Sequence, residues 1–153
     1  TVTGVQTCAL PISGDLITTV LMDAAEQKRR VFAATGSLAA LPWKAEPLPL
    51  LHDGEQSQPR VAAGGSALGA AWLESFVENG NRKTEVVAAF RNARTGAWMP
   101  AKALSTVSDG VPTRPSAAMD PISGMLVAWF EQDQTGRNLV LARAKPTGAC
   151  CCD

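Results

Sequence analysis

The sequence contains a single histidine, His52, and no cysteine between residues 14 and 149. A cysteine–histidine nucleophilic pair therefore cannot form within that stretch. A serine–histidine–aspartate triad needs a carboxylate aimed at the imidazole, but Asp53 is adjacent to His52 in the sequence rather than convergent on its ring. We predict that His52 is a loop residue and that the chain carries no catalytic constellation.

Net charge and long apolar runs are also missing. The chain has 14 Lys and Arg residues against 14 Asp and Glu residues, which gives no reason to expect a nucleic-acid partner or an anionic membrane surface. No apolar run approaches the roughly 18 residues that a membrane-spanning helix needs. We therefore predict no membrane span, and we assign no metal site and no cofactor. The hydrophobic content of 46% is enough to build a core.

The first residues resemble a translated sequencing-library adapter. Val2–Ile12 reads VTGVQTCALPI, which is the in-frame translation of a common sequencing-library adapter, and Ser13 fits the final base of that adapter. We interpret residues 1–13 as adapter-derived, so that Cys8 has no biological role. The alternative is a genuine strand and turn.

The last residues are also unusual. Cys150, Cys151 and Cys152 are adjacent and precede Asp153. Zinc ligands are normally separated by spacer residues, so three neighbouring thiols cannot converge on one ion. We interpret residues 150–153 as a truncated or misread end, with a metal or redox cluster and an ordinary tail as the alternatives. Residues 14–149 remain as the predicted domain.

An internal repeat is the most informative feature of what is present. Pro59–Glu74 (PRVAAGGSALGAAWLE) aligns with Pro115–Glu131 (PSAAMDPISGMLVAWFE), and both segments end in Ala-Trp-x-Glu. The two prolines lie 56 residues apart. Val87–Ala97 also aligns with Leu139–Ala149, which places Arg91 over Arg143. We predict units of about 56 residues with boundaries near residues 59 and 115.

A weaker third copy lies upstream. Val31–Thr35 corresponds to Val87–Arg91, Trp43 corresponds to Trp98, and Leu16–Asp23 takes the place of the Ala-Trp-x-Glu segment with Leu21 at the tryptophan position. The chain therefore holds a partial unit, a complete unit and a second partial unit.

Each unit is predicted to form four short strands. Turn signals at residues 64–65, 78–81 and 95–96 separate the strands of the complete unit. The expected strands are Arg60–Ala63, Leu68–Glu74, Glu85–Arg91 and Ala101–Ser105. The nearly continuous apolar runs Met125–Phe130 and Leu139–Ala142 further predict strands buried on both faces.

A helix is the competing interpretation for one of these segments. Ala67–Glu78 places Leu68, Trp72 and Phe76 at positions i, i+4 and i+8, which is helical spacing. Asp23–Arg30 is also rich in helix-forming residues. The aligned copy MLVAWFEQDQTGRN lacks the helical stripe and has a turn at Thr135-Gly136, so we favour a strand.

Units of this length with four strands are typical of propeller blades. We predict an all-β fold with about two to two-and-a-half four-stranded antiparallel propeller-type blades, that is, an incomplete propeller. The repeat resembles those of bacterial exported proteins with sialidase-like β-propellers. The residues that carry this resemblance are Pro59, Ala62, Gly69, Ala71, Trp72, Glu74, Ala89, Arg91, Gly96, Trp98, Leu104 and Ser105.

The sequence departs from the sialidase pattern in its chemistry. Sialidases use a tyrosine nucleophile, a carboxylate acid/base and several arginines, and this chain contains no tyrosine. The sialidase Asp-box is not cleanly present either, because Asp120, Gly124 and Trp129 are spaced too widely. The resemblance therefore implies a fold and an extracellular, periplasmic or cell-surface location rather than an activity.

Asp23, Glu74 and Glu131 occupy equivalent positions in the three units. One interpretation is a ring of carboxylates that binds a cation or a sugar. The interpretation that we favour is a strand end that reaches solvent or pairs with the repeated arginines Arg91 and Arg143. These arginines are themselves expected to pack their stems and pair locally, with an anion clamp as the alternative.

The tryptophans divide into two pairs. Trp72 and Trp129 lie inside apolar runs and are predicted to be core residues. Trp43 and Trp98 lie near turns, where an exposed stacking role stays open. The Gly-rich stretch from Ala63 to Gly69 lacks the Lys-Ser/Thr of a phosphate-binding loop, so we interpret it as a turn.

These observations predict a non-catalytic propeller segment of an exported or cell-surface protein, with a glycan or a protein as partner. The alternative is a fragment of a sialidase-like glycoside hydrolase whose catalytic residues lie outside this chain.

Overall fold

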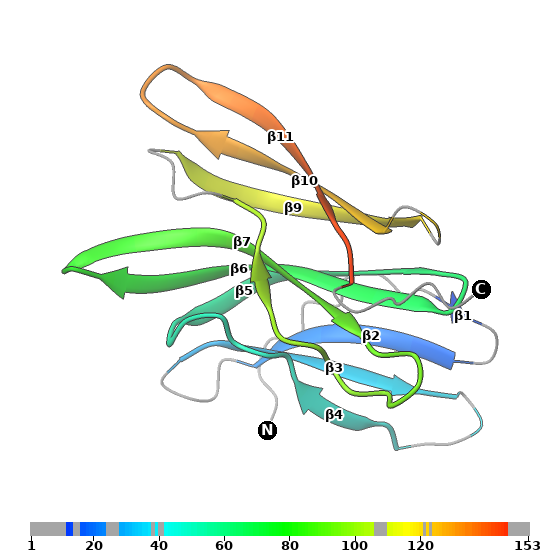
Figure 1. Cartoon of the computed structure of the whole chain (residues 1–153). Coiled ribbons are helices and arrows are strands. Elements are labelled where there is room, and N and C mark those ends of the chain that lie inside the picture. The colour runs from blue at the N-terminus through cyan, green and yellow to red at the C-terminus, as the bar shows by residue number, and fades with distance from the viewer. Residues whose placement is uncertain are drawn as a thin grey trace.

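The chain forms three antiparallel β-sheets that stack on one another, as the computed structural model in Figure 1 shows. The structure describes residues 12–13, 16–23, 28–37, 39, 42–105, 110–120, 122 and 124–146, with side chains from residue 28 onward and Lys44 excepted. The described residues contain strands and turns but no helix. The all-β prediction is therefore confirmed.

The sheets follow one another along the chain. The first sheet has the order β1-β2-β3-β4, the middle sheet β5-β6-β7-β8 and the third sheet β9-β10-β11. The first contains β1 (Ile12–Ser13), β2 (Leu16–Asp23), β3 (Arg30–Gly36) and β4 (Lys44–Pro47). The middle sheet contains β5 (Glu55–Gly64), β6 (Ala67–Glu78), β7 (Asn81–Arg91) and β8 (Lys102–Ala103). The third contains β9 (Val111–Asp120), β10 (Gly124–Gln132) and β11 (Arg137–Ala144). These are the blades of an incomplete propeller.

The helical alternative for Ala67–Glu78 is wrong, because this segment is strand β6 and pairs with both β5 and β7. A spacing of four is also an even number, so Leu68, Trp72 and Phe76 share one face of a strand as well as one face of a helix. The turn that follows settles the conformation locally. Asn79 and Gly80 both have positive φ, at 52° and 78°, as a type I′ hairpin turn requires.

Two apolar cores hold the stack together. Val31, Ala33, Val61, Trp72 and Val87 pack between the first and middle sheets. The second core lies between the middle and third sheets and includes Ala71, Leu73, Val86, Ala88, Phe90, Met125, Val127 and Trp129. Strands β6 and β7 therefore bury both of their faces over most of their length.

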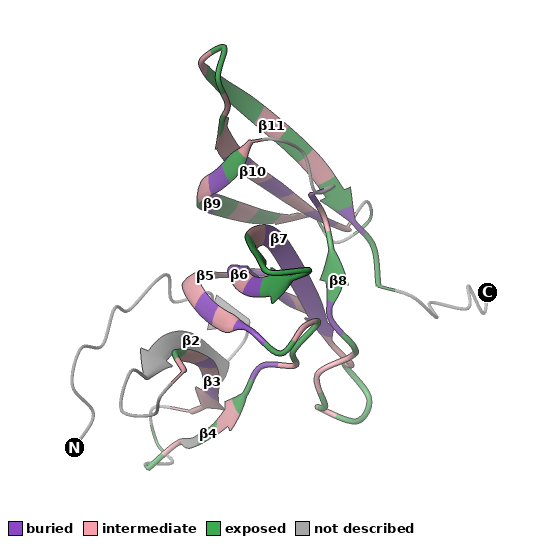
Figure 2. Ribbon diagram, turned by 90° about the vertical axis from the view of Figure 1, so that its left-hand side faces the viewer, coloured by how far each residue is buried: buried purple, intermediate pink, exposed green. Residues whose placement is uncertain are grey.

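Among the described residues, the third sheet packs against another sheet on one face only. Figure 2 shows β11 largely green and pink, for exposed and half-buried residues, against the purple of the buried β7. The prediction that Met125–Phe130 and Leu139–Ala142 are buried on both faces is wrong. Residues of β10 alternate between buried and half-buried, and Leu139 and Leu141 are 69% and 65% exposed. The apolar runs suit a strand between two sheets, but the described residues place a sheet on one side of β10 and β11 only.

The first strands of the middle and third sheets, β5 and β9, share an unusual backbone feature. Gln58 and Arg114 have positive φ values of 50° and 53°, and each precedes a fully buried proline, Pro59 or Pro115. The register of each strand against its neighbour shifts at this point. The Gln58 side-chain oxygen accepts a hydrogen bond of 2.8 Å from the backbone N–H of Arg114. The bulges of adjacent sheets are therefore tied together.

Candidate functional site

A row of buried polar side chains crosses the middle sheet near the end of β6. Gln56, Glu74 and Glu85 are paired in register across β5, β6 and β7, so they lie side by side. Their exposures are 0%, 0% and 6%. Because Glu74 is two residues from Trp72, the row faces the first sheet. Buried polar groups are expensive unless each finds partners, so the partners define what this row does.

The connection between β4 and β5 supplies the partners of Glu74. The backbone N–H groups of Leu51 and His52 both donate to its carboxylate, the former over 3.0 Å. The Trp72 indole N–H donates to the second oxygen at 3.2 Å. These three N–H donors offset the free-energy cost of removing the Glu74 carboxylate from solvent. Its role in this geometry is to anchor residues 51 and 52 against the sheet.

His52 links this connection to the next carboxylate. Its Nε2 atom lies 3.0 Å from a carboxylate oxygen of Glu85, and its ring stacks on Phe76 with the centroids 3.7 Å apart. Sequence analysis correctly places His52 outside the strands. It misses the convergence with Glu85, because a separation of 33 residues is closed only by the fold.

Gln56 completes the row. Its side-chain oxygen accepts a hydrogen bond from the Val31 N–H, and its amide nitrogen donates to the Pro49 carbonyl. Sequence analysis missed Gln56 and Glu85 as partners of this cluster. The sequence held one weak signal for these partners, namely a polar residue opposite Glu74 in each neighbouring strand. That signal can be recognised only when the strand register is known.

A cavity of about 380 Å³ opens beside this row. Phe76 and Val77 give it an apolar wall, and charged groups surround them. Its lining residues are Lys28, Asp53, Gly54, Glu55, Ser75, Phe76, Val77 and Arg82. Lys28 donates a hydrogen bond to Asp53 at 2.6 Å and thereby holds the pKa of that carboxyl below its ordinary value. A hydrogen bond from Arg29 at 2.8 Å does the same for the pKa of Glu55.

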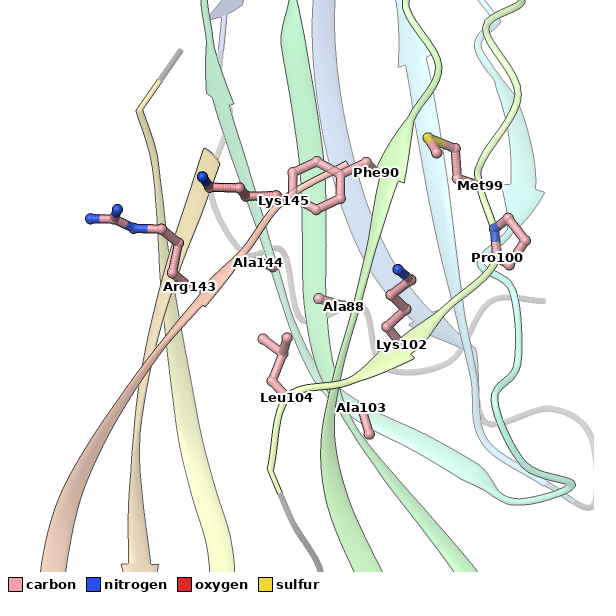
Figure 3. Close-up of a pocket in the computed structure, with 10 residues that line it drawn as sticks. All are labelled: Ala88, Phe90, Met99, Pro100, Lys102, Ala103, Leu104, Arg143, Ala144 and Lys145. Atoms are coloured by element: carbon pink, nitrogen blue, oxygen red, sulfur yellow. The ribbon is translucent and has the colours of Figure 1, made fainter. Parts of the chain in front are cut away.

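A second cavity, of about 230 Å³, lies between the middle and third sheets (Figure 3). Ala88, Phe90 and Leu104 line it together with the cationic residues Lys102, Arg143 and Lys145. The Arg143 side chain in Figure 3 points away from Phe90 and Met99, so it contributes little charge to the interior. Neither cavity holds a set of three or more metal-binding side chains, and no such set occurs among the described residues.

The three repeated carboxylates differ in their surroundings. Glu74 is fully buried, so the expectation that it reaches solvent or pairs with Arg91 is wrong. Glu131 is half-buried and accepts a 2.9 Å hydrogen bond from the Trp129 indole, which repeats the pairing of Trp72 with Glu74. The backbone of Asp23 ends β2 opposite Arg30, but its side chain lies outside the described residues.

The two arginines are not equivalent. Arg91 is paired in register with Leu68, on the face of β6 that carries Trp72. Arg143 is paired with Leu126, on the face of β10 opposite to Trp129. The register makes Ala144 the counterpart of Arg91, so the sequence alignment is displaced by one residue here and the side chain changes face. Arg91 pairs locally as expected, 2.6 Å from the Gly96 carbonyl and 3.6 Å from Glu46.

The tryptophans follow the expected division. Trp72 and Trp129 are 0% and 1% exposed, which confirms that they are core residues. Trp43 and Trp98 are both half-buried, and the Trp43 indole donates to the Ser37 carbonyl. Trp98 packs against the first core, so neither is a free stacking platform. The Gly-rich stretch forms the turn at residues 65–66 between β5 and β6, as predicted.

Comparison with known proteins supports the fold. No protein-family model matches the sequence, and no curated protein matches it. The structure is similar to the crystal structure of an endo-arabinase from Bacteroides thetaiotaomicron, with a TM-score of 0.52 and 9% sequence identity. The match covers 92% of this chain and 56% of the endo-arabinase, so the chain spans little more than half the length of that protein. At this identity the likeness concerns the fold alone. No helix among the described residues is long and apolar enough to cross a membrane.

Proposed function

We propose that the chain is a non-catalytic segment of a β-propeller in an exported or cell-surface protein. Its role is structural and includes the binding of a ligand. The observation that carries the proposal is the burial and hydrogen bonding of Glu74. This repeated carboxylate is fully buried, and both of its oxygens accept N–H donors from the β4–β5 connection and from Trp72. The placement outside the cell is supported by the resemblance of the repeat to exported propellers.

The remaining carboxylates near the larger cavity are also engaged. Glycoside hydrolysis needs two carboxyl groups that face one bond, about 5 to 10 Å apart, with access for water. Glu85 is buried and bonded to His52, while Asp53 and Glu55 are held as acceptors by Lys28 and Arg29. Carboxylates held in these contacts stabilise the fold instead of exchanging protons with a substrate.

The larger cavity is the place that we propose for a ligand. Its walls combine Phe76 and Val77 with paired charges, which can donate and accept hydrogen bonds without an excess of either sign. This combination suits a neutral polar partner, either a glycan or a protein loop.

A glycoside hydrolase is the second candidate, and one specific observation favours it. The fold is similar to an endo-arabinase of which it spans 56%, so catalytic residues of a parent enzyme would lie in blades outside this chain. Long-read sequencing of the source DNA tests this candidate. Flanking units with a tyrosine beside a carboxylate and further arginines would favour a sialidase-like enzyme.

The main proposal is tested by assaying the purified full chain on linear arabinan and on aryl arabinosides and sialosides. We expect no turnover above the buffer background. The Glu85→Gln variant serves as the matched control, because it keeps the size of the side chain and removes its charge. Turnover that disappears in this variant while its melting temperature is unchanged would contradict the proposal and assign a catalytic role to the row.

A further inference from the structure

The tip of the hairpin that joins β6 to β7 projects into solvent. Figure 1 shows this hairpin extending past the ends of the neighbouring strands. All the residues of its turn are exposed, namely Glu78, Asn79, Gly80 and Asn81. A side-chain carbon added at Gly80 would meet no atom within 4 Å, so nothing packs against the turn there. Water therefore reaches the backbone and the side chains of the turn.

The turn places an unrestrained asparagine side chain before a glycine. The side-chain amide of Asn79 makes no hydrogen bond with a described residue, although its backbone carbonyl accepts one from the Asn81 side chain at 3.4 Å. Glycine has no Cβ atom, so the backbone nitrogen of Gly80 is sterically unshielded. An accessible backbone nitrogen beside an unrestrained amide is the arrangement in which an asparagine side chain can cyclise.

We propose that Asn79 is a site of spontaneous covalent modification, which converts this asparagine to aspartate and isoaspartate. The backbone nitrogen of Gly80 forms a bond to Cγ of Asn79, and the Cγ–Nδ2 bond breaks. The nitrogen that leaves takes up the amide proton of Gly80 and departs as ammonia. One water molecule then opens the resulting succinimide ring. Opening at Cγ gives aspartate, and opening at the backbone carbonyl carbon gives isoaspartate.

The Asp53-Gly54 pair could form the same ring, but its surroundings differ. Lys28 donates a hydrogen bond to the Asp53 carboxylate at 2.6 Å. The Gly54 N–H donates to the His52 carbonyl at 2.9 Å, so the attacking nitrogen is engaged as well. Both reacting groups are thus held apart from each other. Neither restraint is present at Asn79 and Gly80 among the described residues.

The other asparagines of the chain are less suited to cyclisation. Asn81, Asn92 and Asn138 are each followed by a residue with a Cβ atom, which shields the backbone nitrogen. The side-chain oxygen of Asn92 also accepts two backbone hydrogen bonds, and the side chain of Asn138 donates one to Asp133 at 3.2 Å. Asn81 lies in the same exposed turn as Asn79, so it is the natural internal control.

The hairpin controls the rate of the reaction. Ring closure requires the Gly80 nitrogen to approach Cγ of Asn79, whereas the pairing of Glu78 with Asn81 holds the turn in its closed form. The ion pair between Lys83 and Glu78 lies at the same end. The ends of hairpins open at a low cost in free energy, so we expect the ring to form while this end is frayed.

Isoaspartate at this position would reshape the end of the hairpin. Its backbone runs through the side-chain carbon, which lengthens a two-residue turn whose length sets the register of the strands. The next pair along the hairpin, Val77 with Arg82, lines the larger cavity. The effect on a ligand in that cavity rests on the proposed function, but the modification of Asn79 does not.

Incubation of the full chain in water labelled with heavy oxygen, followed by peptide mapping with mass spectrometry, tests the proposal. We expect Asn79 to react at least about tenfold faster than Asn81, because the nitrogen of Gly80 is unshielded. The products should be aspartate and isoaspartate, each with one labelled oxygen. Equal rates at the two asparagines, or aspartate without isoaspartate, would overturn the proposal.

Two further measurements test the route. The chain unfolded in guanidinium chloride should react several-fold faster at Asn79 than the folded chain, because the turn no longer restrains the glycine nitrogen. Equal rates would overturn control by the hairpin. The Asn79→Gln variant should show no reaction at this position, since its longer side chain would have to close a larger ring. These readouts are covalent masses, so turnover or ligand binding that contradicts the proposed function leaves them unchanged.

Discussion

At the scale of single residues, tryptophan and glutamate in the Ala-Trp-x-Glu segments act as a unit. The indole N–H groups of Trp72 and Trp129 donate to Glu74 and Glu131 over 3.2 and 2.9 Å. Residues two apart share a face of a strand, so the spacing in the motif is the shortest that allows this contact. The contact satisfies the polar end of a large buried ring and the carboxylate together.

Loss of the Glu74 carboxylate should destabilise the chain. Glu74→Ala leaves three N–H donors without their acceptor, and we expect a loss of about 2–4 kcal/mol in the free energy of unfolding. Urea denaturation followed by tryptophan fluorescence measures it. Glu78→Ala on the same strand is the control, since Glu78 is exposed and forms a surface ion pair with Lys83. Equal midpoints for the two variants would refute the anchoring role.

The ion pairs around the larger cavity should make stability fall in acid. The hydrogen bond from Lys28, and the charges of Lys28 and Arg30, lower the pKa of Asp53 in the folded chain. A lowered folded pKa favours the ionised form, so this contribution is present above the unfolded value of about 3.9 and is lost as the pH falls through the folded value.

The Lys28→Met variant isolates that contribution. We expect its urea midpoint to lie slightly below that of the unmodified chain at pH 7, and the two midpoints to converge as the pH falls below the ordinary aspartate range. The difference at pH 7 should shrink in about 1 M salt, because these groups are exposed and salt screens them. A difference that is unchanged across the pH series would contradict the assignment.

At the scale of strands, the bulges of β5 and β9 carry strain that the fold tolerates. A positive φ for a residue other than glycine costs on the order of 1–3 kcal/mol. At Arg114 the side chain is exposed, and the backbone N–H supplies the contact with Gln58. The conformation of this strand is thus set by the backbone and the neighbouring sheet rather than by the arginine side chain.

Arg114→Gly should therefore raise stability. Relief of the positive φ outweighs the roughly 0.5–1 kcal/mol that glycine loses in chain entropy, so we expect a gain of about 1 kcal/mol. Arg143→Gly is the matched control, because Arg143 is an exposed strand arginine and is not among the residues with positive φ. It should lower stability by about 0.5–1 kcal/mol. Thermal melts at low protein concentration compare the two, and a loss in both would argue against strain at Arg114.

At the scale of the whole molecule, the stack is unequal. The middle sheet contributes to both apolar cores, whereas the third sheet contributes to one and leaves Leu139 and Leu141 of β11 exposed. Opening of an outer sheet exposes one core, but opening of the middle sheet exposes two. The middle sheet therefore cannot open without the loss of the whole fold.

Amide hydrogen exchange should reveal this order. We expect the amides of β6 and β7 to exchange most slowly, at the rate of global unfolding, and those of β11 to exchange at least tenfold faster. The measurement is peptide-resolved exchange with mass spectrometry, at a concentration where the chain is monomeric. Equal protection of β11 and β7 would contradict this order.

The approximate positions of the strands, the turns and the buried tryptophans follow from the sequence alone. Alternating and continuous apolar runs, together with Asn79-Gly80 and Thr135-Gly136, fix these local choices. Strands β5, β6 and β7 are longer than expected: β5, for example, begins at Glu55 rather than Arg60, and Gln56 within it is paired with Glu74. Strand β8 is shorter, since it spans Lys102–Ala103 and the predicted strand spans Ala101–Ser105.

The partners across sheets were decided by tertiary structure. The contact of His52 with Glu85, the burial of Glu74 and the opposite directions of Arg91 and Arg143 depend on strand register, and a shift of one residue reverses every side chain. Local propensity determines which residues become strands. Whether a face is covered depends on which sheet packs against it, and this is why equivalent runs are buried in β7 and exposed in β11.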